Sequence, residues 1–301
     1  MSTSASRTPR ARSALAAALG AVMASSSPLV WAGAWVQEQG QSLWIAKYLH
    51  SESNAYFDDD HNRRDFDSRG RSRQDQLNLY VEYGITENLT FVGNFYGSRF
   101  KYTNDTSRTQ PGVDDTSTGL NDQEIGVRYR LNPGSGEGPW VGALQGLVVV
   151  PGYDRPKGED TSPALGLGGA GVELRYSLGR GYMVGSRNAY VDMGAGVRLR
   201  TGGAADELRA DFSTGVGISQ RWTLIGEINQ IQSLGNGQDD GIDQDAVGRF
   251  VANNYSLTKV QLSTIANLSP ATQLQVGWQQ PVMGRNTGTG GGPFLGFWWR
   301  Y

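Results

Sequence analysis

The chain lacks cysteine entirely, and its 301 residues include only two histidines, His50 and His61. Without cysteine, a disulfide framework is excluded, and so are thiolate ligands for zinc or for iron–sulfur clusters. A serine nucleophile usually needs a histidine within hydrogen-bond reach, so hydrolase chemistry has few candidates. His50 is followed by Ser51, but neighbouring strand residues point to opposite faces, so the two would not form a dyad. We therefore expect no enzyme, no catalytic residue, no cofactor and no bound metal.

Long apolar runs and an excess of basic charge are also missing. No stretch approaches the roughly 18 to 20 consecutive apolar residues of a membrane-spanning helix, and the mean hydropathy is −0.44. The formal net charge is −2 and the basic residues are dispersed, which argues against nucleic acid as a partner. A low mean hydropathy still permits membrane insertion through strands, because only every second residue of such a strand faces lipid.

The first 32 residues have the composition of a secretory signal peptide. A basic start without acidic residues precedes an apolar run at positions 14–24 that is too short to span a bilayer as a helix. Val30 and Ala32 occupy the two positions that a signal peptidase reads, so we expect cleavage before Gly33. A cut near residues 24–27 is the alternative. The sequence thus predicts a leader at 1–32 and one exported domain at 33–301.

Polar and apolar residues alternate in the exported part, most clearly over residues 75–83. The apolar set is Leu77, Leu79, Val81 and Tyr83, and the set between them is Gln76, Asn78, Tyr80 and Glu82. Since the side chains of a strand have a period of two, this segment has one apolar face and one polar face. Behind a secretory leader, the pattern favours an apolar face that contacts lipid over one that packs on a second sheet.

The same alternation predicts about twelve strands. We expect them at residues 39–49, 74–84, 89–99, 122–130, 140–150, 164–177, 188–200, 206–219, 222–233, 255–266, 272–280 and 294–301. Short connectors alternate with long polar ones, as in bacterial barrels with short periplasmic turns and long external loops. The fold class is therefore all-β: a transmembrane antiparallel β-barrel in the outer membrane of a Gram-negative cell.

The C-terminus and the first long connector indicate partners in that membrane. Apolar residues alternate back from the end at Tyr301, Trp299, Phe297 and Leu295. This pattern resembles the signal that the outer-membrane barrel-assembly machinery reads. In the first connector, arginines interleave with aspartates at Arg63, Arg64, Arg69, Arg71 and Arg73 and at Asp58, Asp59, Asp60, Asp65 and Asp67. We expect contacts with outer-membrane lipid, and with lipopolysaccharide phosphates through these loop arginines.

Charged residues fall on the positions that we assign to the lumen. They are Glu82, Glu124, Arg128, Arg130, Glu173, Arg175, Asp192, Arg198, Arg200, Arg209, Asp211 and Glu227, with Lys259 beside them. A charge in the lumen needs water or a partner. In one interpretation bases and acids line opposing walls of a pore and create a transverse field. In the other they pair across neighbouring strands and fill a narrow barrel.

Two short segments resemble a known family. The opening Ala32-Gly-Ala-Trp35 with Gly40, and the strand–turn–strand unit Leu79–Thr90, are similar to transporters named after the MetA pathway of phenol degradation. The resemblance implies passage of small solutes, apolar or aromatic ones among them, and transfers no ligand-binding residue. We therefore expect an outer-membrane channel for small solutes. The alternatives are a structural or surface-binding barrel with a plugged lumen and, least favoured, an outer-membrane hydrolase.

Overall fold

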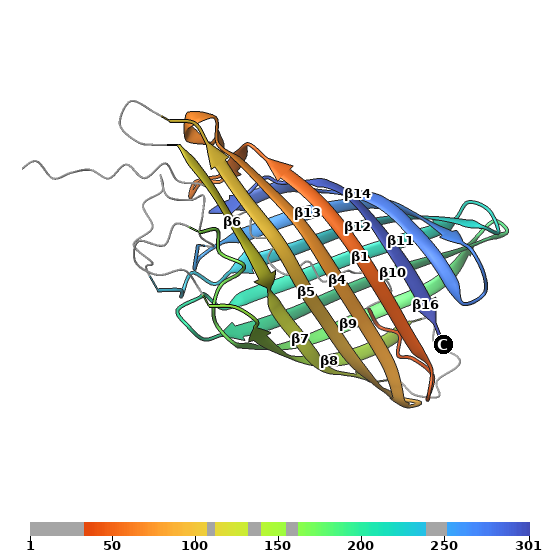
Figure 1. Ribbon diagram of the computed structural model, residues 1–301. Coiled ribbons are helices and arrows are strands. Elements are labelled where there is room, and N and C mark those ends of the chain that lie inside the picture. Colours follow the sequence, from red (N-terminus) through yellow and green to blue (C-terminus); the bar gives the residue numbers. More distant parts are fainter. Residues whose placement is uncertain (1–32, 107–111, 132–139, 155–161, 239–251) are drawn as a thin grey trace, which may run out of the picture.

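The computed structural model describes residues 33–106, 112–131, 140–154, 162–238 and 252–301, which form one closed antiparallel barrel (Figure 1). Its wall consists of β1 (Ser42–Ser53), β4 (Arg71–Thr86), β5 (Leu89–Asn104), β6 (Val113–Leu120), β7 (Asp122–Arg130), β8 (Val141–Pro151), β9 (Gly171–Val184), β10 (Arg187–Arg200), β11 (Glu207–Gly217), β12 (Trp222–Ser233), β13 (Ser256–Asn267), β14 (Thr272–Arg285) and β16 (Gly292–Arg300). β6 and β7 both pair with β5, every other wall strand pairs with the next wall strand along the chain, and β1 pairs with β16 to close the ring.

The barrel wall has twelve strand positions, as the sequence predicts, because β6 and β7 occupy one position beside β5. β6 pairs with the half of β5 near Asn104, and β7 pairs with the half near Leu89. All pairings in the wall are antiparallel, and closure pairs every wall strand on both sides except β6, which pairs with β5 alone among the described residues. Among the described residues, no helix has the length and apolar character needed to cross a membrane.

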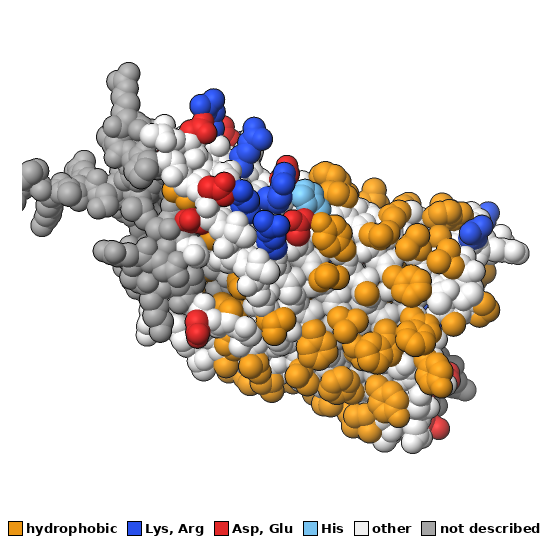
Figure 2. All heavy atoms as spheres, viewed as in Figure 1, with side chains coloured by type: hydrophobic (Ala, Val, Ile, Leu, Met, Phe, Trp, Pro, Cys, Tyr) orange, Lys and Arg blue, Asp and Glu red, His pale blue; other side chains and the backbone are white. Residues whose placement is uncertain are grey.

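The outer surface of the wall carries a broad apolar band (Figure 2). Leu77 is 62% exposed, Leu79 39% and Trp299 47%, as predicted for outward residues, whereas Val81, predicted to face outward with them, is only 7% exposed. The side chains between them, such as Gln76 and Asn78, are buried on the inside. This alternation follows from the pleat of each strand, and it gives the wall a lipid-facing side and a lumen side.

The two ends of the barrel differ in their connections. Two-residue turns join β4 to β5 and β9 to β10 at the end where the C-terminus lies (Figure 1). The opposite end carries the long connections. There, β2 (Ala55–Phe57) and β3 (Arg63–Asp65) of the first loop form a small sheet with β15 (Thr287–Gly288) of the last loop. A short 3₁₀ turn, η1 (Asp67–Arg69), leads back into the wall.

Several strands differ from the prediction: β6 lies in a predicted connector, β5 and β14 extend farther than predicted, and the sixth and first strands begin elsewhere. The sixth strand is β9 at Gly171–Val184, and not residues 164–177, so the turn predicted at 178–187 is wrong. Gly168 has φ +78°, outside the extended region, which keeps the glycine-rich stretch out of the sheet; the turn itself lies at Gly185, φ +60°. The first strand begins at Ser42, and not at Gln39, because the residues before it turn into the lumen.

Candidate functional site: the barrel lumen

The structure places the twelve charged residues assigned to the lumen at inward positions of their strands. Ten are buried: Glu82, Glu124, Arg128, Glu173, Arg175, Asp192, Arg198, Arg209, Asp211 and Glu227. Arg130 and Arg200 are half-buried, although the side chain of Arg200 is only 1% exposed. Lys259 is buried on the same side. Charges that are buried to this degree are stable only with partners, so the geometry of pairing decides what the lumen can do.

A network of ion pairs crosses the middle of the lumen. Arg198 on β10 contacts Glu124 on β7 at 2.5 Å and Glu173 on β9 at 2.7 Å. Arg175 contacts Glu173 at 2.9 Å and also pairs with Asp211 on β11. β7 and β10 are separated in the sheet by two strands, so the Arg198–Glu124 pair reaches across the interior and is more than a contact between neighbours.

The network continues toward the long loops through two acids that the sequence prediction did not include. Arg200 contacts Asp122 at 3.1 Å and Glu207 at 2.7 Å. Arg209 lies 3.7 Å from Glu207 and 3.6 Å from Glu173. Asp122 lies two residues before Glu124 on its strand, and Glu207 lies two residues before Arg209, so each pair faces the same side. The inward assignment could therefore have been extended to both acids.

A second buried cluster surrounds Arg128 nearer the short turns. Its guanidinium contacts Glu82 at 2.7 Å, donates to the Tyr80 hydroxyl at 3.1 Å, and donates twice to Gln145 at 2.8 and 3.0 Å. The Arg128 side chain is 1% exposed, and the Glu82 side chain is 0% exposed. The planar guanidinium therefore has acceptors along most of its rim.

The segment 33–41, which precedes β1, enters the barrel: residues 33–37 are buried or half-buried, and residues 38–41 are exposed. Beside the start of β1, Gly40 N–H donates to the carbonyl of Gly84 at 2.9 Å. The residues that precede Gly40 in the chain lie farther inside the barrel. Farther along, Gln37 N–H donates to the Thr90 hydroxyl at 2.8 Å. The carbonyl of Trp35 accepts from Arg128 at 2.9 Å.

The same segment reaches the opposite wall. Ala34 N–H donates to Asp192 Oδ2 on β10 at 3.0 Å, and the Trp35 ring meets the Tyr190 ring edge-on, with centroids 6.2 Å apart. The segment therefore spans the lumen near the short turns and fills part of its cross-section.

Wall glycines make room for this inserted segment. A β-carbon on Gly84 would lie 2.0 Å from the carbonyl oxygen of Glu38, and one on Gly179 would lie 2.5 Å from the Trp35 ring. Sequence reasoning missed the insertion. The available signal was a tryptophan between small residues directly before the first strand, but an inserted segment has no periodicity that identifies it.

The lumen also contains an apolar cluster, which the sequence prediction missed. Leu43 and Ile45 on β1 point inward with Trp298 on β16, Ile225 on β12 and Ile265 on β13, all at most 3% exposed. The available signal was a first strand with apolar residues at both parities, since Trp44 and Tyr48 face outward. The lumen thus contains both an apolar cluster and paired charges.

Neither histidine lies in the lumen. His50 points out of the wall, with Nδ1 2.7 Å from Asp75 Oδ1, while Ser51 is buried on the inner face. His61 lies in the first loop and contacts the carbonyl of Gly284 at 2.9 Å. The described residues contain no group of three or more His, Asp or Glu side chains suited to hold a metal ion.

The fold is shared with solved outer-membrane proteins. The COG4313 outer membrane channel from Pseudomonas putida F1 is 14% identical with a TM-score of 0.60, over 89% of this chain and 98% of that chain. The transport unit of the autotransporter AIDA-I from Escherichia coli is 10% identical with a TM-score of 0.47, over 92% and 94%. The translocator domain of the autotransporter NalP from Neisseria meningitidis is 10% identical with a TM-score of 0.45, over 88% and 90%.

Sequence comparison adds no further relative. No protein-family model matches the chain, and no curated protein matches it. At 14% identity, the likeness to the P. putida channel concerns the fold, and the chain has the fold of an outer-membrane β-barrel.

Proposed function

We propose that the protein is an outer-membrane channel for small solutes, apolar and aromatic compounds included, whose lumen is closed by segment 33–41. The proposal includes export through the secretory pathway and recognition of the last strand, which ends at Tyr301, by the barrel-assembly machinery. The long loops would then face the outside of a Gram-negative cell and the short turns the periplasm.

The observation that carries the proposal is that the closing element does not belong to the wall. Segment 33–41 is held by separate hydrogen bonds, to Glu82, Gly84, Thr90, Arg128 and Asp192, and by one isolated bridge between Gln39 and Gly84, without a strand ladder of its own. A typical hydrogen bond contributes about 0.5–1.5 kcal/mol net. Such a segment can leave the lumen while every pair of wall strands stays intact.

The composition of the lumen supports the solute class. The apolar cluster around Ile45, Ile225 and Trp298 gives an apolar or aromatic solute a surface to contact. Arg175 and Arg198 are already paired with acids, which limits their attraction for a single ionic solute. The family resemblance of the Leu79–Thr90 unit points to the same solutes.

A structural barrel with a plugged lumen is the second candidate. The specific observation in its favour is the burial of the side chains of Arg128 and Arg198, 1% and 0% exposed, because their surroundings leave no room for water. If these networks stay closed, nothing passes even after segment 33–41 has left.

Removal of the closing segment separates the two candidates. A variant that lacks residues 34–39 should show larger single-channel conductance in a planar bilayer than the intact protein. Vesicles containing the variant should also take up a small aromatic solute faster than a sugar of similar size. Asp59→Asn, in a loop outside the lumen, is the matched control and should behave as the intact protein. Absence of current and of solute uptake in the deletion variant would establish the plugged barrel.

A further inference from the structure

Basic side chains gather on the outer face of the wall, just beyond the apolar band. Arg71 and Arg73 on β4 and Arg99 and Lys101 on β5 all have outward parity. Strand register pairs Arg73 with Lys101. Figure 2 shows blue and red side chains gathered at the edge of the apolar band, on the side of the long loops. Sequence reasoning had placed Arg71 and Arg73 in the first loop, whereas the structure places them on the wall.

The change from apolar to charged side chains is abrupt. Register sets Tyr48 opposite Leu77, which is 62% exposed, in the last apolar row. In the next row of outward-facing residues toward the long loops, His50 lies opposite Asp75, and Asp75 lies opposite Arg99. Two strand residues cover roughly 7 Å. If the barrel sits in the outer membrane as proposed above, the charged rows lie at the headgroup level of the outer leaflet.

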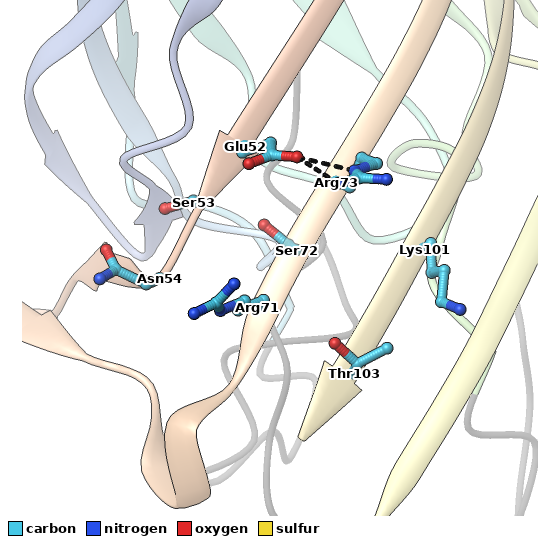
Figure 3. Close-up of a pocket in the computed structure, with 8 residues that line it drawn as sticks. All are labelled: Glu52, Ser53, Asn54, Arg71, Ser72, Arg73, Lys101 and Thr103. Atoms are coloured by element: carbon cyan, nitrogen blue, oxygen red, sulfur yellow. Dashed lines mark hydrogen bonds and ion pairs between the residues drawn. The ribbon is translucent and has the colours of Figure 1, made fainter. Parts of the chain in front are cut away.

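The charged rows border a groove. A cavity of about 520 Å³ is lined by Glu52, Ser53, Asn54, Arg71, Ser72, Arg73, Lys101 and Thr103 (Figure 3). A smaller one of about 180 Å³ lies among Arg73, Asp75, Arg99 and Lys101. The two share Arg73 and Lys101, so one extended ligand can contact both.

The acids near the groove are already engaged. Glu52 accepts from Arg73 at 2.8 Å, and Asp114 contacts Lys101 at 2.7 Å. Asp75 contacts His50 at 2.7 Å and accepts from the Tyr48 hydroxyl at 2.7 Å. Arg71 and Arg99 are exposed, and neither has an ion pair with any residue in the described ranges. Two guanidinium groups thus remain for an anion from outside, and the planar guanidinium suits phosphate.

We propose that Arg71, Arg73, Arg99 and Lys101 form a binding site for the phosphate groups of lipid A, the phosphorylated glycolipid anchor of lipopolysaccharide. Lipid A carries phosphates on a rigid disaccharide above its acyl chains. The phosphates would contact the two charged rows while the acyl chains lie along Leu77 and the apolar band. A free phosphate ion shares the charge but not this apolar contact.

The test is lipid binding by the purified full-length barrel in detergent, measured by native mass spectrometry. The probes are lipid A, dephosphorylated lipid A, phosphatidylglycerol and inorganic phosphate. Arg71→Ala/Arg99→Ala should weaken lipid A binding by at least about tenfold. Arg187→Ala/Arg221→Ala, at the short-turn end, removes the same charge and should bind lipid A as the intact protein does.

The outcomes are distinct. Strong binding of lipid A alone, lost in the Arg71/Arg99 variant, supports the site. Equal binding of dephosphorylated lipid A, of phosphatidylglycerol or of inorganic phosphate overturns it, as does full binding by the Arg71/Arg99 variant. Heat-modifiable migration on gels verifies that each variant forms the barrel. Conductance tests the channel separately, so lipid binding and channel activity can fail independently.

Inside the lumen, Asp192 carries an independent inference. It is 4% exposed, and it forms no ion pair with a described residue. Its carboxylate accepts from Ala34 N–H, and a β-carbon placed on Gly33 would lie 1.8 Å from Oδ2. The α-carbon of Gly33 therefore lies directly against this carboxylate, and only glycine fits there.

We infer that the chain is cut before Gly33 and that the α-ammonium group so formed pairs with Asp192. Hydrolysis of the Ala32–Gly33 peptide bond consumes one water and leaves a carboxylate on Ala32 and an amine on Gly33, which is protonated at neutral pH. The new charge would give a buried carboxylate its counterion and would fasten segment 33–41 to the wall opposite β4.

Amine labelling tests this inference. Intact mass should place Gly33 first in the barrel purified from membranes, and an amine-reactive reagent at neutral pH should leave its α-amine unmodified in the folded state. Unfolding should expose the amine, and Asp192→Asn should expose it in the folded barrel. A different first residue, or equal labelling of folded intact protein and folded Asp192→Asn, overturns the inference.

Discussion

Arginines inside the barrel and arginines on its outer face have opposite surroundings. Arg198 is 0% exposed and contacts two carboxylates, whereas Arg99 is exposed and has no ion pair among the described residues. Inside, the removal of one partner leaves a buried charge uncompensated. On the outer face, water solvates an exposed arginine whether or not it has an acidic partner. The same residue type thus holds the structure together in the lumen and remains available for a ligand on the surface.

The largest effect is expected from breaking the inner network. Arg198→Met leaves Glu124 and Glu173 buried without their shared partner and should cost about 3–5 kcal/mol of unfolding free energy. Arg99→Met should change it by less than about 0.5 kcal/mol. Urea unfolding in detergent micelles, followed by tryptophan fluorescence, measures both. Equal costs would show that burial does not distinguish the two arginines.

A charge placed on the lipid face should cost nearly as much. Leu79→Arg lies within the apolar band, where an arginine is destabilising by about 2–4 kcal/mol near the bilayer midplane. Thr103→Arg also points outward, but it lines the charged groove and should cost little. Refolding yield into lipid vesicles compares them, and similar yields would contradict the placement of the membrane boundary between these rows.

A single substitution in the wall should release segment 33–41 from the lumen without deleting it. Gly84→Ala would place a methyl group 2.0 Å from the carbonyl oxygen of Glu38, whereas Gly146→Ala meets nothing within 4 Å. Conductance should rise for Gly84→Ala and stay unchanged for Gly146→Ala. Unchanged conductance in both variants would show that segment 33–41 does not limit passage.

The smallest effect concerns a pair in the loops. Hydrogen bonds from Arg285, at 2.8 Å, and from Asn286 hold the pKa of Asp59 below its usual value. A lowered pKa in the folded state contributes stability above the ordinary pKa of the carboxyl, and this stability disappears as pH falls through the lowered value. The pair is half-exposed and screened by solvent, so its contribution is less than about 1 kcal/mol. Proteolysis of the first loop should be faster at pH 3 than at pH 7, and Asp59→Asn should remove most of that difference.

The wall could be predicted from the sequence because every strand of a barrel alternates outward and inward side chains. The period of two placed Leu77 outward and Glu124 inward, and β7 and β12 have the predicted bounds. The glycine-rich start of the predicted sixth strand failed, because glycine lacks the side chain whose alternation defines a strand.

The contents of the lumen depend on contacts that local periodicity does not encode. Arg198 meets Glu124 across two intervening strands, a distance of 74 positions in the chain. Segment 33–41 obeys no period, and its place is visible only from its partners at Thr90 and Asp192. The alternation of side chains along a strand predicts that each charged residue faces inward. Its partner can be identified only from the three-dimensional structure.

The small sheet of β2, β3 and β15 joins the first long loop to the last one, across the line where β1 meets β16. Phe57 and Thr287, which pair in it, are 230 positions apart in the chain. The first and last strands of the wall are thus joined twice, once by their own ladder and once by the small sheet of the loops. A protease that nicks either loop would leave both fragments joined at this seam, so cleavage there would go unnoticed until the barrel was denatured.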